Sequence, residues 1–343
     1  MKEIRIALVG GFASTNIGND FFTQSIRHVL SEILPGQHII VTQNLPGYYW
    51  KEGGTNPANS FNYIKCLELD FLVLTGPLFD ASFPLLWEDT ISALKKKGTE
   101  IILFSAGSQR YDEAERRVVG EFLKKIKPYA LVTRDTPTYE AFREYAQMSY
   151  DGIDFAFFLN DLFTPYPLDV EKFVVLNFDT GPEPRFGRES QYENGFTFLG
   201  NRMSYRLQHP GKMRKRVYKH LPGLSGYHNS SFGNYTIIRP VNYINPGNRK
   251  GFFRVPNTYV SELAFDYLNL FAHAQGVLTS RVHTCIASLV FGKEVMLFSP
   301  TLRRQLFGRV GLEDITLRPV TLDPDYLRDE KEKMLVFIKG IFT

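Results

Sequence analysis

Cysteine is scarce in this sequence, which contains two, Cys66 and Cys285, among 343 residues. So few cysteines argue against a disulfide framework, and both lie in apolar helical patterns that predict buried thiols. No apolar run approaches the roughly 18 residues that a membrane-spanning helix needs. The first ten residues predict the charged start of a strand and not a signal peptide. These absences favour a cytoplasmic protein.

Motifs for dinucleotides and metals are also missing. The first expected strand, Ile4–Val9, is followed by a glycine-containing loop and a helix at about 20–34, but no GxGxxG occurs there. The second strand, His38–Val41, ends in Gln43-Asn44 and lacks the acidic residue that would hold a ribose. NAD binding is therefore not expected. No spacing typical of metal ligands appears, so we expect neither a metal nor a cofactor.

The sequence does contain a regular alternation of strand-like and helical segments. Its 43% hydrophobic and 22% charged residues are ordinary for a globular protein, and its length predicts two domains. Further strands are expected at Phe71–Leu74, Glu100–Phe104, Ala130–Thr133, Tyr150–Phe157, Phe173–Asn177, Tyr235–Ile238, Gly276–Thr279 and Glu294–Phe298. Further helices are expected at about 84–97, 112–126, 136–146, 262–274, 284–291, 301–309 and 323–341. This order predicts an α/β protein with doubly wound parallel sheets.

The expected domain boundary lies between Asn160 and Asp169, where two prolines occur. We predict a Rossmann-like domain at 1–165 and a second at 170–343, which includes the C-terminal helix. The second domain contains an insertion at about 180–255 with weak periodicity, in which 211–220 is one candidate helix.

The segment Ser280-Arg281-Val282-His283 joins an expected strand to an expected helix. Ligands of open α/β sheets bind at the carboxyl ends of strands, and helix N-termini favour anions. The arginine and the histidine at this junction therefore predict an anion site. Both are also compatible with structural roles, Arg281 in an ion pair and His283 bonded to a backbone carbonyl.

Several strand-end motifs, in order, resemble those of the polysaccharide pyruvyl transferase family. The matching residues are Gly10, Asn16, Gly18 and Asp20; Gly76 with Leu78-Phe79-Asp80; Ser105-Ala106-Gly107; Arg134-Asp135 with Thr138; Asp154; and Arg281-Val282-His283. The resemblance spans 4–159 and 259–312. The sequence departs from the family at Pro77 and at Thr284, which replaces the usual glycine. It also lacks a lysine that the family often has, and Arg303 or Arg304 is the candidate substitute.

This resemblance implies two Rossmann-like domains that face one another across a cleft, as in GT-B enzymes. It implies pyruvate transfer from phosphoenolpyruvate, a donor substrate, onto a sugar of a surface polysaccharide or glycan precursor. Arg281 and Arg134 would bind the donor's anionic groups, and His283 would act as acid and base or bind phosphate. The remaining donor-binding candidates are Ser280, Arg303, Arg304, Gly10, Asn16, Gly18, Asp20, Gly76 and Gly107. Asp154 is as compatible with a structural role as with a catalytic one.

Two other functions remain open. One is a GT-B-type glycosyltransferase that uses a nucleotide sugar. The other is a catalytically inactive relative that binds a glycan or an anion, which the departures at Pro77 and at the lysine favour.

Positive charge is concentrated in the insertion. Residues 185–254 contain 13 lysines and arginines against two glutamates, although the net charge of the chain is only +4. A solvated insertion is the simplest interpretation. Binding of a lipid-linked glycan acceptor is the next, and contact with an anionic inner-membrane face through Lys212–Lys219 is a third. Nucleic-acid binding is not expected, because no motif supports it.

Overall fold

The structure is a computed structural model that describes residues 3–10, 16–42, 61–179, 182–208, 231–242, 253, 255–299 and 301–343. Its strands are β1 (Arg5–Val9), β2 (His38–Thr42), β3 (Phe71–Thr75), β4 (Glu100–Ala106), β5 (Ala130–Thr133), β6 (Met148–Asp151), β7 (Phe173–Asn177), β8 (Arg185–Arg188), β9 (Asn194–Phe198), β10 (Asn201–Arg206), β11 (Ser231–Phe232), β12 (Tyr235–Pro240), β13 (Thr258–Tyr259), β14 (Gly276–Thr279) and β15 (Glu294–Leu297). Its α-helices are α1 (Ile17–Ile33), α2 (Tyr63–Cys66), α3 (Phe83–Lys95), α4 (Glu113–Ile126), α5 (Thr136–Phe142), α6 (Leu159–Leu162), α9 (Ala264–His273), α10 (Val282–Leu289) and α11 (Pro324–Ile341). The described residues also form the 3-10 segments η3 (Arg143–Tyr145), η4 (Phe155–Phe158), η6 (Leu302–Val310) and η7 (Glu313–Thr316).

The first domain is built on a parallel sheet of order β2-β1-β3-β4-β5-β6. Its four central strands, β1, β3, β4 and β5, are buried on both faces, which explains their continuous apolar sequences. Ile6 and Leu8 of β1 face the core that contains α1, whereas Ala7 and Val9 face the core that contains α3 and α4. The predicted α/β class and the predicted parallel arrangement are confirmed here.

The second domain has a sheet of order β11-β12-β7-β14-β15, parallel except at the β11–β12 hairpin. Helices α9 and α10 cover one face. A separate antiparallel sheet, β8-β10-β9, covers the other through an aromatic cluster that includes Phe186, Phe196 and Phe298. This small sheet lies within the insertion that the sequence left unassigned. The candidate helix at 211–220 lies outside the described residues.

Two local predictions were wrong. The strand predicted at Tyr150–Phe157 ends at Asp151, and Phe155–Phe158 forms a 3-10 turn because the Asp154 carboxylate accepts a hydrogen bond from the Ala156 N–H. The helix predicted at about 301–309 is present, as the 3-10 helix Leu302–Val310. Cys66 is exposed in the short helix α2, whereas Cys285 is buried as predicted.

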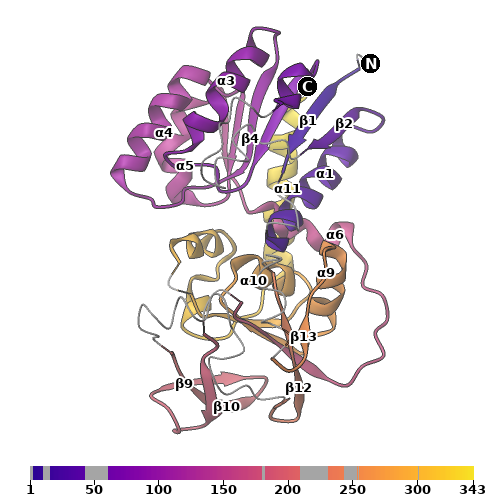
Figure 1. The fold of residues 1–343 in the computed structure, drawn as a ribbon, viewed down its shortest axis with the longest axis vertical. Helices are drawn as coiled ribbons and strands as arrows, with labels where there is room; N and C mark the ends of the chain where they lie inside the picture. Colours follow the sequence, from indigo (N-terminus) through magenta and orange to yellow (C-terminus); the bar gives the residue numbers. More distant parts are fainter. Residues whose placement is uncertain are drawn as a thin grey trace.

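The two domains share one hydrophobic core, which includes Phe21 of α1, Phe155 of η4 and Phe271 of α9. Helix α11, which the sequence assigned to the second domain, runs back to the first sheet, so both chain termini lie at the end formed by the first domain (Figure 1). There Phe337 stacks on Tyr150 with ring centroids 5.0 Å apart. The last helix therefore completes the first domain's core.

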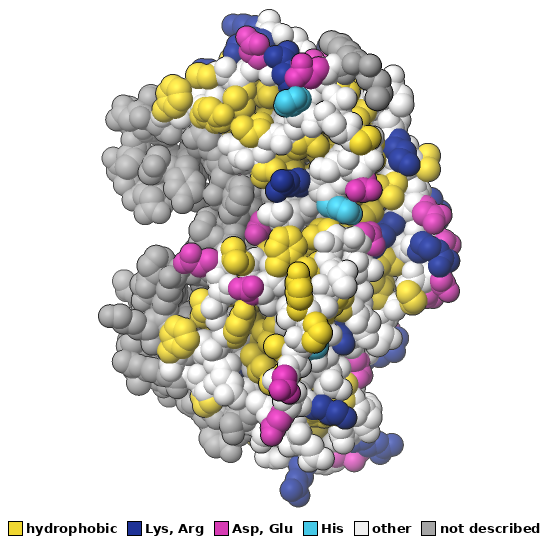
Figure 2. Space-filling model, turned by 90° about the vertical axis from the view of Figure 1, so that its right-hand side faces the viewer, with side chains coloured by type: hydrophobic (Ala, Val, Ile, Leu, Met, Phe, Trp, Pro, Cys, Tyr) yellow, Lys and Arg dark blue, Asp and Glu magenta, His cyan; other side chains and the backbone are white. Residues whose placement is uncertain are grey.

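Acidic and basic side chains are interspersed on the face shown in Figure 2. Among the described residues, no helix combines the length and the apolar character needed to cross a bilayer. The basic segment Lys212–Lys219 lies outside the described residues, so its predicted contact with a membrane remains a prediction.

Candidate functional site

Three arginines from different strand ends lie near one another where the domains meet. Arg134 directly follows β5, Arg281 precedes α10 as its N-cap, and Arg303 lies in η6 after β15. Burial lowers the pKa of the Arg303 guanidinium, and the positive charges of Arg134 and Arg281 lower it further. The fold thus brings together cations that repel one another, although 169 residues of sequence separate the first from the last.

Asp154 links Arg134 to His283. The Arg134 Nη1 donates to Asp154 Oδ2 over 3.3 Å, and His283 Nε2 lies 3.6 Å from the same oxygen, within ion-pair range. Asp154 and Arg134 belong to the first domain, whereas His283 belongs to the second. Burial alone would raise the pKa of Asp154, but His283, Arg134 and the Ala156 N–H together lower it to about 2. The Asp154 carboxylate is therefore ionised at neutral pH.

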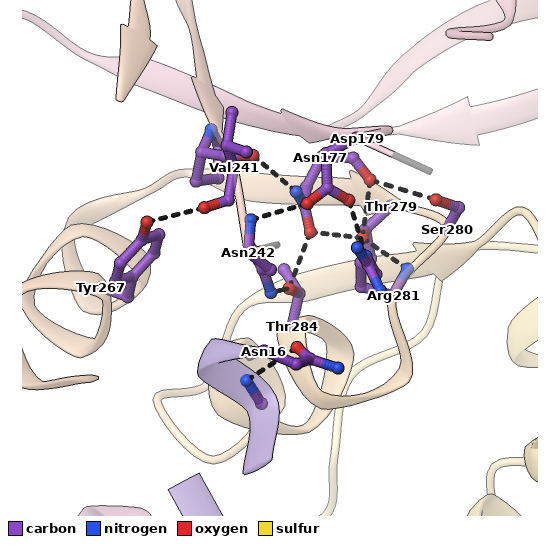
Figure 3. A network of polar contacts seen from close by, with 12 residues as sticks. Asn16, Asn177, Asp179, Val241, Asn242, Tyr267, Thr279, Ser280, Arg281 and Thr284 are labelled. Carbon is purple, nitrogen blue, oxygen red and sulfur yellow. Dashed lines mark hydrogen bonds and ion pairs between the residues drawn. The ribbon is translucent and has the colours of Figure 1, made fainter. Parts of the chain in front are cut away.

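Arg281 is held by a second buried carboxylate. Its Nε donates to Asp179 Oδ1 over 2.6 Å, and its backbone N–H donates to Thr279 Oγ1. The other carboxylate oxygen of Asp179 accepts from the Asn242 N–H. Figure 3 shows these groups converging at the ends of β7 and β14, beside the start of α10. The predicted structural role for Arg281 and the predicted anion role are both compatible with this arrangement.

Arg303 crosses from the second domain to the first, where its Nη2 donates to Gln109 Oε1. Gln109 in turn donates to the Pro77 carbonyl over 2.5 Å. Arg304, by contrast, is exposed, and its side chain has no hydrogen bond or ion pair with the described residues. Of the two candidates for the family's lysine, the structure brings only Arg303 to the arginine cluster.

The cluster has more donors than acceptors. Arg134 is 1% exposed, and its Nε and Nη2 have no hydrogen-bond partner among the described residues; the same holds for the buried Nη2 of Arg281. A buried polar group without a partner is destabilising by about 1–3 kcal/mol, and more when it is charged. Asp154 and Asp179 supply two negative charges to three arginines. An anion that entered the cluster would provide both the missing acceptors and the missing charge.

The sequence profile of the polysaccharide pyruvyl transferase family matches residues 16–301, which include all these side chains except Arg303 and Arg304. The chain belongs to the polysaccharide pyruvyl transferase family. It is therefore a transferase, as the sequence predicted. No match is found among the curated proteins.

Solved structures resemble the chain in fold. One is the Staphylococcus aureus MnaA–UDP co-structure, with a TM-score of 0.53, 11% identity, and coverage of 98% of this chain and 88% of that one. Another is a UDP-N-acetylglucosamine 2-epimerase, described as putative, from Listeria monocytogenes, with a TM-score of 0.53, 13% identity, and coverage of 99% and 90%. At such identities the likeness concerns the fold alone, and it confirms the predicted GT-B-like arrangement.

Thr284, where the family usually has glycine, has a structural role. Its hydroxyl donates to Asn177 Oδ1 and accepts from Asn242 Nδ2, both over 2.8 Å. All three side chains are buried. The substitution therefore joins the ends of β7 and β12 to α10 and leaves the pyruvyl transferase motif Arg-x-His in place.

The predicted glycines lie at tight contacts. A Cβ at Gly107 would lie 2.4 Å from Arg134 Nε, and one at Gly76, where φ is +91°, would lie 2.8 Å from Phe22 Cζ. A Cβ at Gly10 would collide with Thr23, so Gly10 permits close packing of β1 and α1. Gly18 lies against His283 itself. Two of the four glycines thus contact side chains of the candidate site.

The other predicted residues take supporting positions. Asn16 caps α1 by accepting from the Gly18 N–H, and residues 11–15 before it lie outside the described residues. Ser280 donates its N–H to the Asn177 carbonyl. Asp20 accepts from Gln24, and burial raises its pKa. Asp20 has no ion pair with the cations that the structure describes.

A pocket of about 800 Å³ lies elsewhere, between β8-β10-β9 and the β11–β12 hairpin. Tyr235 and Ile237 line it, and β12 pairs there with Phe173 and Val174, the first residues of β7. The arginines follow the opposite, carboxyl ends of the strands. None of the three arginines of the cluster lines this pocket.

Proposed function

We propose that this chain transfers pyruvate from phosphoenolpyruvate onto a sugar of a surface polysaccharide or of a lipid-linked glycan precursor. One observation carries the proposal: three arginines from two domains meet beside a histidine, with buried N–H groups that lack acceptors among the described residues. Phosphoenolpyruvate carries a phosphate and a carboxylate on adjacent positions, and planar guanidinium groups bind both kinds of group bidentately.

The reaction requires few parts beyond this cluster. Two acceptor hydroxyl oxygens bond to C2 of the donor, and the bond from C2 to the phosphate oxygen breaks. Of the two hydroxyl protons, one ends on the methylene carbon, which becomes a methyl group, and the other ends on inorganic phosphate. A ketal that bridges two hydroxyls results. Histidine exchanges protons near neutral pH, so His283 is the proposed acid and base.

The arginines have distinct positions for these roles. Arg134 and Arg281, each with one arm on a carboxylate, would bind the donor's two anionic groups with their remaining N–H groups. Arg303, which has no carboxylate partner among the described residues, would bind the donor's phosphate and neutralise the charge that it gains on departure. It takes the role of the family's lysine in this proposal.

The nearest alternative is transfer from a nucleotide sugar, because one similar structure contains UDP. Thermal unfolding with each donor separates the two. We expect phosphoenolpyruvate to raise the melting temperature, and UDP-N-acetylglucosamine to leave it unchanged, since only a ligand of the folded state stabilises it. The Arg281→Gln variant should lose the phosphoenolpyruvate effect, whereas Arg318→Gln, a remote exposed arginine, should keep it.

Turnover is tested by phosphate release from phosphoenolpyruvate in the presence of fractionated glycan acceptors. Release that depends on both the acceptor and His283 supports the transferase. If only the nucleotide sugar raised the melting temperature, the proposed function would instead be that of a glycosyltransferase. Tight phosphoenolpyruvate binding without release from any acceptor would instead identify an inactive relative.

A further inference from the structure

The two ring nitrogens of His283 lie in different surroundings. Nε2 is buried and has no hydrogen-bond partner within the described residues, and Asp154 Oδ2, at 3.6 Å, is its ion-pair partner. The side chain as a whole retains 12% exposure, which belongs to atoms other than Nε2. Asp154 lies on the Nε2 side of the ring, so Nδ1 is the ring nitrogen left for a substrate.

The first domain fixes the orientation of the ring. A Cβ on Gly18 would lie 2.7 Å from His283 Nδ1, so the first turn of α1 packs directly on that edge. The Phe22 ring lies 5.4 Å away, centroid to centroid. Nε2 points in the other direction, toward the N-terminus of η4. The imidazole is thus packed between α1 and Asp154, although it belongs to the second domain.

Asp154 is itself held firmly. It is fully buried, its Oδ1 accepts from the Ala156 N–H over 2.9 Å, and its Oδ2 accepts from Arg134. A carboxylate in this position accepts a hydrogen bond from an N–H group and repels the lone pair of an unprotonated ring nitrogen. It therefore favours the histidine tautomer whose proton is on Nε2, by the same logic that orients histidines beside carboxylates elsewhere.

We propose that Asp154 is a positioning residue which holds the proton of His283 on Nε2, so that Nδ1 is the nitrogen that exchanges protons with the substrate. The same carboxylate accepts a hydrogen bond from Arg134 Nη1, so that Nε and Nη2 of that arginine remain to bind an anion. Asp154 thereby orients both Arg134, which would bind phosphoenolpyruvate, and His283, the proposed acid and base. It contacts no substrate itself.

The chemical role of Nδ1 rests on the proposed function. In that reaction the Nδ1 lone pair accepts a proton from an acceptor hydroxyl while the proton on Nε2 stays in place, facing Asp154. Nδ1 then returns the proton to the departing phosphate or to the methylene carbon. No proton moves to Asp154, because its carboxylate remains ionised throughout.

The tautomer can be measured without any substrate. Histidine ¹⁵N labelling of the full chain, with long-range ¹H–¹⁵N spectra at pH 8–9, distinguishes a protonated from an unprotonated ring nitrogen, and the His283→Gln variant assigns the signals. We expect His283 to carry its proton on Nε2 and this proton to exchange slowly with water, because it is buried. A proton on Nδ1 in the wild-type protein would overturn the proposal whether or not pyruvyl transfer is ever observed.

Variants separate positioning from simple packing. In Asp154→Asn the slowly exchanging Nε2–H signal should broaden or disappear, and a second tautomer should become populated. Asp151→Asn removes a carboxylate three residues earlier, whose partners are Thr136 and Arg309, and should leave the His283 signals unchanged. Unchanged signals in Asp154→Asn would also overturn the proposal. If Asp154→Asn does not fold, the wild-type spectrum still decides.

Discussion

Gly18 of the first domain and His283 of the second are packed so closely that no side chain fits between them. An ideal Cβ at Gly18 would lie 2.7 Å from Nδ1 and 2.8 Å from Cβ of His283. In addition, the Ile17 N–H donates to the Asn242 carbonyl of the second domain. The first turn of α1 is therefore part of the surface that positions the candidate acid–base residue.

The Gly18→Ala variant should lose most transfer activity, because its methyl group must displace the imidazole. Such overpacking destabilises by about 1–3 kcal/mol. Phosphate release and thermal unfolding measure the two effects. Gly340→Ala is the matched control: it also lies in a helix, but a methyl group there would meet no described atom within 4 Å. It should be neutral or slightly stabilising, and an equal loss of activity in both variants would contradict this account.

Arg303 and Arg304 test which arginine substitutes for the family's lysine. Arg303→Gln should weaken phosphoenolpyruvate binding by about 10–100-fold, since a hydrogen bond to a charged group contributes about 1.5–3 kcal/mol. Titration calorimetry measures the affinity. Arg304→Gln alters an exposed side chain at the next position and should bind as the wild type does. The opposite pattern would assign the role to Arg304.

Thr284→Val should destabilise the fold by about 1–3 kcal/mol, because it leaves the buried amides of Asn177 and Asn242 without one partner each. Valine keeps the shape of threonine, so the loss reports the hydroxyl. Urea unfolding gives the free energy. Thr284→Ser retains the hydroxyl and should lose clearly less. Equal losses would mean that the methyl group, and not the hydroxyl, matters.

The charge of Asp154 predicts a pH dependence of stability. Its pKa falls from 3.8 to about 2 on folding. A group with a lowered pKa stabilises the fold above its unfolded pKa, and this contribution disappears as the pH falls through the folded value. The difference in unfolding free energy between wild type and Asp154→Asn should thus shrink as the pH falls from about 4 to about 2. A difference that grows below pH 4 would contradict the assignment.

The cysteines should differ in reactivity. A thiol reagent should label Cys66 in the folded protein and both cysteines after unfolding, because Cys285 is buried and burial raises its pKa well above the usual value. A Cys66→Ser variant should remain unlabelled until it unfolds. Rapid labelling of that folded variant would show that Cys285 is accessible.

The sequence predicted the parallel strands well, because strands buried on both faces appear as uninterrupted apolar runs between turn residues. The same rule failed at Phe155–Phe158, where an equally apolar run is turned by the side chain of Asp154. Composition alone does not distinguish these cases. A capping aspartate directly before the run was the available signal.

The candidate site was predicted as a set of residues and not as an arrangement. Arg281, His283 and Arg134 could be chosen because each follows a strand end. Their partners could not: Gln109 lies 194 residues from Arg303, and Asp154 lies 129 residues from His283. Such contacts depend on how one domain packs against the other. Local sequence patterns do not specify that packing.

Helix α11 also has a consequence for how the protein is made. Met334, Ile338 and Ile341 contribute to the core that covers one face of the first sheet, yet they follow every strand of the second domain in the chain. N-terminal domains usually fold first as the chain leaves the ribosome. Here the domain that begins folding first is completed by a helix made after the second domain's strands, so part of its apolar face stays uncovered until that helix has left the ribosome.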